Sequence, residues 1–207
     1  MIPLERAFDL YKDAFGVEPL NDRCDFLACL HRVCAALPKP CRVLEVGTYM
    51  GKSAFIMACA MHGTDSQLIC IDPVFIEDRH VCTDAHHAWS GYHSNVSDVL
   101  CRLARHNLAQ GVSIVPGFSE WVYSKWDGRS LQMVLVDSAH TGPQVTLDCR
   151  WSEHVTVGGF CLFDDWIEDV RDAAMAYFAD KPNWELVHQS NAEMTEQWAI
   201  TSFRRNS

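Results

Sequence analysis

The side chains best suited to chemistry follow two apolar runs in the second half of the chain. Asp137 and His140 come after one run, and Asp164 and Asp165 come after the other. Carboxylates held close together repel one another, and a hard divalent cation such as Mg²⁺ relieves that repulsion because it prefers oxygen ligands. The alternative is that Asp137 and Asp165 only cap a turn and a helix. We expect a Mg²⁺ site formed by Asp137, Asp164 and Asp165.

His140 lies three residues after Asp137. An imidazole gains and loses a proton near neutral pH, so His140 suits the role of general base. The alternative is a histidine that only hydrogen-bonds a loop.

Residues 43–51, Val-Leu-Glu-Val-Gly-Thr-Tyr-Met-Gly, form an apolar run that ends in an acid and two glycines. Such a strand turns tightly into a helix whose free N–H groups can face a nucleoside-containing cofactor. A dinucleotide fingerprint would need a second glycine where Tyr49 stands, and no Gly-Lys-Ser/Thr phosphate loop occurs. A purely structural turn is the alternative.

Hydrophobic periodicity predicts alternating strands and helices. Helices are expected at 3–15, 21–37, 51–62, 94–110, 118–126, 142–155 and 167–180, and strands at 42–46, 67–71, 112–115, 132–136, 159–163, 184–189 and 197–203. Strands separated by helices form a parallel, doubly wound sheet covered on both faces. The last two strands are too close for a helical crossover, so we expect an antiparallel pair that completes a seven-stranded, mostly parallel α/β sheet. In such a sheet ligands bind beyond the carboxyl ends of the strands.

The acid followed by Gly-x-x-x-Gly resembles motif I of the class I S-adenosylmethionine-dependent methyltransferases. Residues 136–141, Val-Asp-Ser-Ala-His-Thr, and residues 157–166, Val-Gly-Gly-Phe-Cys-Leu-Phe-Asp-Asp-Trp, are similar to the macrocin O-methyltransferase-like group. That group is related to the catechol and caffeoyl-coenzyme A O-methyltransferases. The similarity covers about residues 40 to 203.

The resemblance implies a Rossmann-like methyltransferase fold, S-adenosylmethionine as cofactor and a small hydroxylated methyl acceptor. Glu45 would hold the methionine part of the cofactor and Asp72 its ribose hydroxyls, the alternative for Asp72 being a turn acid before Pro73. Ser119 and its neighbours, ordinary turn residues, would border the adenine. Trp121 either covers that ring or lies in the core. The implied cofactor residues are Glu45, Gly47, Thr48, Tyr49, Gly51, Ser53, Asp72, Gly117, Phe118, Ser119 and Asp137.

Within the family pattern, Asp137, Asp164 and Asp165 correspond to Mg²⁺ ligands of the metal-dependent relatives. The chain departs from the pattern at two positions, because His140 stands where the catechol type has a lysine base and Ser138 replaces a glycine. One rival is therefore a metal-independent N- or O-methyltransferase that uses His140 as base or a substrate nitrogen as nucleophile. A second rival is a noncatalytic nucleoside-binding α/β protein.

Composition limits the partners. A formal net charge of −10 does not favour nucleic acid, since phosphate backbones are bound by concentrated Lys and Arg. No apolar stretch approaches the roughly 18 residues of a membrane span, and no signal peptide begins the chain, so we expect a cytoplasmic protein without membrane contact. The ten cysteines contain no Cys-x-x-Cys pair, which disfavours zinc and redox sites.

We expect one domain over residues 1–207, with a helical cap at 1–40 and a cofactor-binding core at 41–207. Residues 75–93 form a long irregular segment, for which a substrate lid using Trp89, Tyr92 and His93, a metal-binding loop and a plain surface loop are the alternatives. The N-terminal helices are expected either to complete the lid or to form a homodimer surface.

Overall fold

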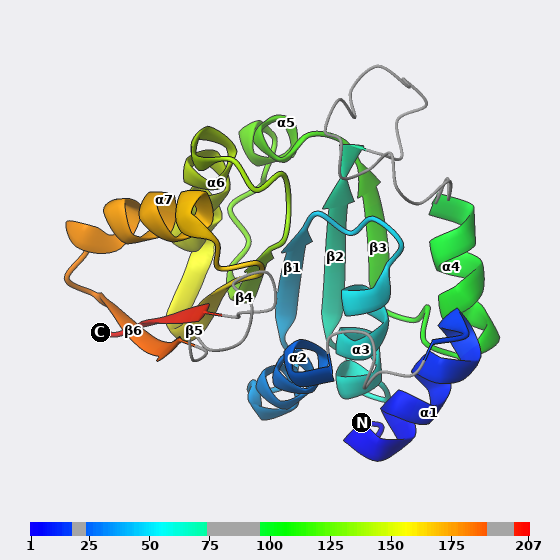
Figure 1. The fold of residues 1–207 in the computed structure, drawn as a ribbon. Coiled ribbons are helices and arrows are strands. Elements are labelled where there is room, and N and C mark those ends of the chain that lie inside the picture. Colours follow the sequence, from blue (N-terminus) through cyan, green and yellow to red (C-terminus); the bar gives the residue numbers. More distant parts are fainter. Residues whose placement is uncertain (18–23, 74–95, 190–200) are drawn as a thin grey trace.

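A seven-stranded sheet forms the centre of the computed structural model, which describes residues 1–17, 24–73, 96–189 and 201–207 (Figure 1). The strand order is β3-β2-β1-β4-β5-β7-β6. The strands are β1 (Arg42–Val46), β2 (Gln67–Asp72), β3 (Val112–Pro116), β4 (Leu131–Val136), β5 (Val155–Phe163), β6 (Trp184–Gln189) and β7 (Thr201–Arg205). The pairs from β3 to β5 are parallel, and β7 is antiparallel to both β5 and β6. The predicted fold class, with its late antiparallel strand, is confirmed.

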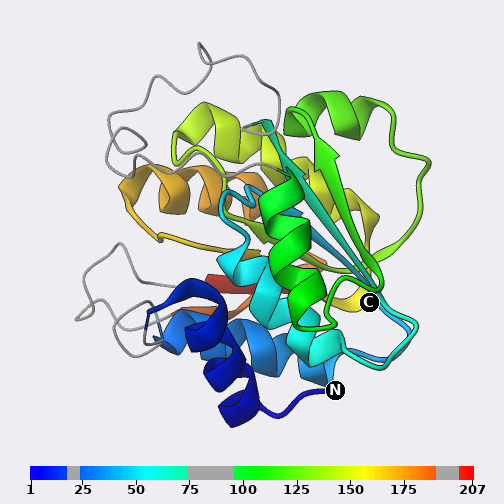
Figure 2. The same cartoon turned by 90° about the vertical axis from the view of Figure 1, so that its right-hand side faces the viewer.

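Helices cover both faces of the sheet. They are α1 (Leu4–Phe15), α2 (Cys24–Ala36), α3 (Lys52–Met61), α4 (Val96–Arg105), α5 (Ser119–Ser124), α6 (Gly142–Asp148) and α7 (Glu168–Ala179), with a 3₁₀ segment η4 (Cys149–His154) after α6. Figure 2 shows α6 and α7 on one side of the sheet and α1 and α2 on the other. Among the described helices none is long and apolar enough to cross a membrane.

The two faces arise from the two-residue period of a strand. In β4, Met133 and Leu135 join the core beneath α1 to α4, whereas Val134 and Val136 join the core beneath α6 and α7. All four side chains are buried, so β4 is apolar along its length, as a strand covered on both faces must be.

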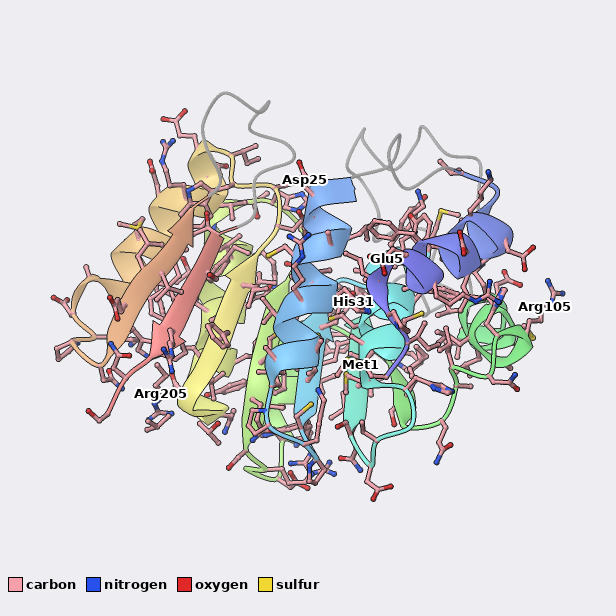
Figure 3. All side chains as sticks on the ribbon, turned by 90° about the horizontal axis from the view of Figure 1, so that it is seen from below. Met1, Glu5, Asp25, His31, Arg105 and Arg205 are labelled. Carbon is pink, nitrogen blue, oxygen red and sulfur yellow. The ribbon has the colours of Figure 1, made fainter. Side chains whose placement is uncertain are left out.

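The N-terminal segment packs onto the first of these faces. Figure 3 views that face and shows His31 of α2 beside the N-terminal segment that leads into α1. The imidazole Nε2 of His31 lies 2.8 Å from the carbonyl oxygen of Ile2, and His31 is buried. The first helices are therefore anchored to the core rather than detached from it.

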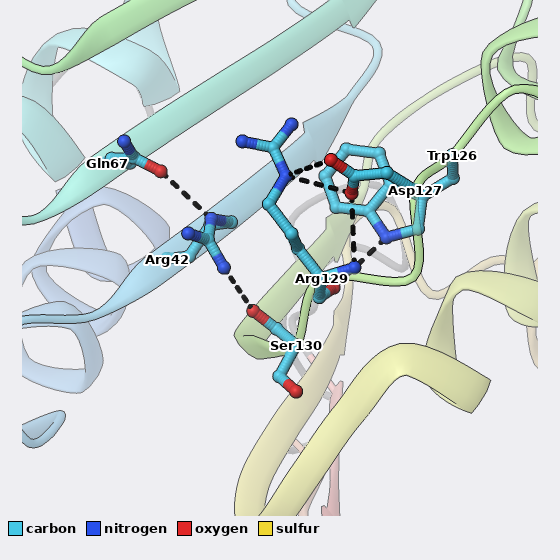
Figure 4. A network of polar contacts seen from close by, with 6 residues as sticks. All are labelled: Arg42, Gln67, Trp126, Asp127, Arg129 and Ser130. Atoms are coloured by element: carbon cyan, nitrogen blue, oxygen red, sulfur yellow. Dashed lines mark hydrogen bonds and ion pairs between the residues drawn. The ribbon is translucent and has the colours of Figure 1, made fainter.

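At the amino ends of the strands, polar side chains tie neighbouring segments together (Figure 4). Arg42 donates to the side chain of Gln67 and to the carbonyl oxygen of Ser130, each at 2.9 Å. Arg129 makes a 2.7 Å ion pair with Asp127. These contacts hold the sheet at the edge opposite the predicted site.

The expected helix 142–155 is wrong in its second half. The helix α6 ends at Asp148, the chain tightens into η4, and β5 begins at Val155 rather than at Gly159. The glycine pair belongs to an irregular stretch inside the strand, because the pairing with β4 shifts between Leu131 and Met133. A side chain at Gly159 would lie 2.7 Å from the carbonyl oxygen of Gln132, so the close approach requires glycine.

The expected helix 94–110 also ends early, at Arg105. Asn107 then adopts a left-handed backbone with φ of 59°, which stops an α-helix. Residues 94 and 95 of that prediction lie outside the described residues.

Candidate active site

The residues that follow β1, β4 and β5 lie side by side at one edge of the sheet. Backbone hydrogen bonds continue past the strand ends, from the N–H of Gly47 to Ile71, from that of Asp137 to Val46, and from that of Asp164 to Val136, at 2.8 to 3.0 Å. The residues that follow these strands are therefore neighbours, as the parallel sheet predicts.

Gly47 brings the ends of β1 and β4 into direct contact. Its φ is 89°, and a Cβ added there would lie 1.8 Å from the carbonyl oxygen of Asp137. Only glycine leaves room for this approach. The loop after β1 and the turn that carries Asp137 and His140 are thus placed next to each other.

Glu45 hydrogen-bonds the glycine loop, which is residues 47–51 between β1 and α3, and the first turn of α3. The carboxylate is completely buried and accepts hydrogen bonds from the hydroxyls of Thr48, at 2.8 Å, and Ser53. Burial raises its pKa to about 7. Glu45 and Ser53 are joined to each other in this conformation, and direct contact of either with a cofactor stays a prediction.

Asp72 binds the same loop from the end of β2. Its Oδ2 accepts the backbone N–H groups of Thr48 and Tyr49 at 2.7 and 2.6 Å, and the residue is 3% exposed. Two adjacent loop amides thus converge on one carboxylate oxygen, as they could on an oxygen of a ligand. In this conformation Asp72 holds the loop through its two amides, and direct contact of Asp72 with ribose hydroxyls stays a prediction.

Helix α4 packs against the second half of the glycine loop, at Met50 and Gly51. Gly51 has a φ of 76°, and a Cβ there would lie 2.7 Å from Cγ1 of Val99. Arg102 donates to the carbonyl oxygen of Met50 at 2.9 Å. The second loop glycine is therefore needed for contact with α4.

His140 joins the exits of β4 and β5. Its Nε2 lies 3.7 Å from Oδ1 of Asp137 and 3.6 Å from Oδ2 of Asp165. This nitrogen is buried, although 33% of the side chain is exposed. Asp165 has a left-handed backbone with φ of 45°, a conformation that Asp tolerates better than most residues. The structure thus brings the predicted base His140 close to two of the three carboxylates that the sequence grouped as a metal site, and the catalytic role of His140 stays a prediction.

The described residues do not show the Mg²⁺ site expected from the sequence, which stays a prediction. Within the described residues, no group of three or more His, Cys, Asp or Glu side chains is placed to hold a metal ion. Asp164 is completely buried, and the imidazole of His140 faces the carboxylates of Asp137 and Asp165. The geometry instead pairs two of the three predicted ligands with a histidine.

A family model described as a methyltransferase domain matches residues 44–166, which include the loop, Asp72, His140 and both acidic exits. The chain belongs to this methyltransferase family. The class I S-adenosylmethionine-dependent methyltransferase recognised from the motifs is therefore confirmed.

Solved structures share the fold of this methyltransferase. The O-methyltransferase NovP is 17% identical with a TM-score of 0.65, and the match covers 88% of this chain and 80% of that protein. The SAH-bound methyltransferase PaMTH1 of Podospora anserina is 13% identical with a TM-score of 0.63, covering 97% and 88%. An O-methyltransferase from Bacillus cereus in complex with SAH is 15% identical with a TM-score of 0.60, covering 98% and 90%. At these identities the shared property is the fold.

The exit of β3 supplies the remaining predicted cofactor residues of the methyltransferase. Gly117 donates its N–H to the carbonyl oxygen of Asp72 at 3.2 Å, and Phe118 precedes α5. Ser119 is buried and accepts a 2.8 Å hydrogen bond from Nε1 of Trp151. Trp121 is 58% exposed, so its assignment to the core is wrong. An exposed aromatic ring at this edge stays compatible with a ligand contact.

Sequence reasoning missed Asp148 of the methyltransferase. This aspartate lies in the last turn of α6, far along the chain from the glycine loop, and it is completely buried. The sequence offered no clear signal, because Asp148 stands in a predicted helix of mixed polarity that also contains Arg150 and Glu153. The predicted lid residues Trp89, Tyr92 and His93 lie outside the described residues.

Proposed function

We propose that this protein transfers a methyl group from S-adenosylmethionine to a hydroxyl of a small molecule, with His140 as the general base. The observation that carries the proposal is the position of His140 Nε2, 3.7 Å from Asp137 and 3.6 Å from Asp165. This cluster lies at the strand edge that also carries the glycine loop. A base and a cofactor loop at one edge are the two parts that methyl transfer requires.

When bound, S-adenosylmethionine supplies a sulfonium whose methyl group is open to in-line attack. Asp72, Thr48 and Tyr49 would hold the cofactor from the loop side, with Glu45 keeping the loop in place through Thr48 and Ser53. Alignment of the acceptor oxygen with the methyl carbon accounts for much of the rate in such a displacement.

The carboxylates of Asp137 and Asp165 determine which nitrogen of His140 serves as the base. Nε2 faces Asp137 and Asp165, so these acids favour the tautomer that carries its hydrogen on Nε2. Nδ1 is then the nitrogen that takes the hydroxyl proton as the oxygen–methyl bond forms and the sulfur–methyl bond breaks. The electron pair of the broken bond stays on sulfur. The imidazolium that results lies within ion-pairing distance of both carboxylates.

The charge and the relatives support the choice of acceptor. A formal net charge of −10 disfavours a nucleic-acid acceptor and leaves a small molecule as the proposed substrate. NovP and the Bacillus cereus protein are named O-methyltransferases, and the Bacillus cereus structure contains SAH. We extend both properties, oxygen as acceptor atom and the S-adenosyl cofactor, to this chain.

Metal assistance stays a prediction from the sequence. Asp137, Asp164 and Asp165 have the chemistry of Mg²⁺ ligands, but the described residues do not group them around an ion, so the mechanism above uses no metal.

Calorimetry with S-adenosylhomocysteine tests the cofactor site. Turnover is then measured with methyl-labelled S-adenosylmethionine and a panel of catechols, phenols and hydroxylated sugars, with and without EDTA. We expect turnover that EDTA does not change, whereas loss of turnover with EDTA would establish the metal-assisted form. Binding of S-adenosylhomocysteine without turnover of any acceptor would favour the noncatalytic rival.

The variant His140→Gln tests the base. We expect turnover to fall by about 10² to 10⁴ while the affinity for S-adenosylhomocysteine stays within about twofold. The control His62→Gln changes an exposed histidine just after α3 and should have no effect. Equal turnover by His140→Gln and the control would refute the assignment.

A further inference from the structure

Asp148 links two turns of the active-site edge from behind. Its Oδ2 accepts the hydroxyl of Ser138 at 2.5 Å, and its Oδ1 accepts the side-chain amide of Gln144 at 3.1 Å. The side chain of Ser119 lies close enough to lower the pKa of this carboxyl. One completely buried group thus receives hydrogen bonds from the turn after β4 and from its own helix, and it lies beside the start of α5.

Ser138 and Ser119 each lie in a turn of the proposed active site. Ser138 directly follows Asp137 and precedes His140 by two residues, in the turn that carries the proposed base. Ser119 is the first residue of α5, at the exit of β3. Its oxygen accepts a hydrogen bond from Nε1 of Trp151 at 2.8 Å, and its side chain lowers the pKa of Asp148. Asp148 therefore connects the proposed catalytic turn with the proposed adenine-side turn.

Burial makes this connection strong. A carboxylate removed from water needs its hydrogen bonds, and losing a donor leaves a buried acceptor unsatisfied. Burial raises the pKa of Asp148, while the hydrogen bonds from Ser119, Ser138 and Gln144 oppose that rise. The geometry of both turns is therefore coupled to one side chain.

We propose that Asp148 is a positioning residue, which sets the turn of Asp137 and His140 relative to the turn of Ser119. The proposal rests on the proposed function for its catalytic meaning. Asp148 itself has no exposed surface, so it acts through the two serines.

Four variants separate the contacts. Asp148→Asn keeps the shape but replaces one of the two accepting oxygens with a donor, so it cannot accept from both Ser138 and Gln144. Ser138→Ala and Ser119→Ala each remove one tether. Gln144→Ala is the matched control, because Gln144 binds the same carboxylate from within α6 and reaches neither turn. Thermal unfolding verifies that each variant is folded, and if Asp148→Asn is not, the two serine variants carry the test.

The first measurement needs no cofactor. In proton–carbon NMR spectra of the histidine rings, the signal of His140 is identified by its absence in His140→Gln. We expect that signal to move in Asp148→Asn and Ser138→Ala, and to stay in place in Gln144→Ala and Ser119→Ala.

The second measurement is the dissociation constant of S-adenosylhomocysteine by calorimetry. We expect Asp148→Asn and Ser119→Ala to weaken binding about tenfold, as the loss of one charge-assisted hydrogen bond would, and Gln144→Ala to stay within about twofold. The proposal is overturned if Asp148→Asn changes neither readout or if Gln144→Ala reproduces both changes. Failure of the unaltered protein to bind S-adenosylhomocysteine would contradict the proposed function, while the histidine spectra would still decide the role of Asp148.

Discussion

The contact between the ends of β1 and β4 makes Gly47→Ala the most informative single substitution. Two independent costs are expected. The φ of 89° is a left-handed conformation, which costs alanine about 1 to 2 kcal/mol. The added Cβ would also lie 1.8 Å from the carbonyl oxygen of Asp137 and 2.8 Å from Cα of Ser138. Both are backbone atoms, which no rotamer change can move.

The size of the second cost follows from the overlap. Ordinary contact begins near 3.4 Å, so 3.4 minus 1.8 leaves about 1.6 Å of displacement between two buried strand ends. Overpacking of this kind costs about 1 to 3 kcal/mol. The expected loss in the free energy of unfolding is therefore about 2 to 5 kcal/mol for Gly47→Ala.

Gly128→Ala is the matched control. Its φ is 79°, but an added Cβ meets no atom within 4 Å, so only the backbone cost of about 1 to 2 kcal/mol applies. Urea unfolding at constant pH measures both variants, and equal slopes show that the same surface is exposed. If Gly47→Ala were no less stable than Gly128→Ala, the direct contact between the two strand ends would be wrong.

Three further predictions address the loop and its supports. Burial raises the pKa of Glu45 from 4.5 to about 7, so the folded protein keeps this proton to higher pH than the unfolded chain does. The stabilisation that comes from this bound proton is complete below about pH 4.5, and it declines by about 3 kcal/mol as the pH rises to 7. Glu45→Gln should remove this part of the pH dependence in urea unfolding, and an unchanged slope would contradict the burial of the carboxylate. Asp72→Ala should weaken binding of S-adenosylhomocysteine at least about tenfold by calorimetry, because two loop amides lose their acceptor, whereas Asp65→Ala on an exposed turn should not. Gly51→Ala and Val99→Ala together should lower the free energy of unfolding by about 1 kcal/mol less than the sum of the two single losses, because removal of the Val99 methyls clears the overlap. Strictly additive losses would refute this prediction.

Local patterns predicted most of the framework. The two-residue period and apolar runs located β1 and β6 at their observed bounds and β4 to within one residue at its start. The boundaries failed where a pattern had two meanings. Gly158 and Gly159 are typical turn residues, but here they lie within β5. Gly158 has a left-handed backbone with φ of 81°, and at Gly159 the neighbouring strand β4 comes too close for a side chain.

The sequence by itself determined the family and the edge of the sheet at which the acids gather. Parallel strands separated by helices must present their carboxyl ends together, so residues next to each strand end become neighbours whatever the details of packing. The glycine loop with Glu45, and the acids after β2, β4 and β5, were therefore recognisable before any coordinates.

Only the tertiary structure decided which of those groups bind one another. It directed Asp72 to the loop amides, placed His140 beside Asp137 and Asp165, and bound Ser138 to the buried Asp148, which lies beside Ser119. The physical reason is that such bonds depend on distances of a few tenths of an ångström between elements far apart in the chain. Periodicity and motif spacing describe each element alone, so they contain no information at that scale.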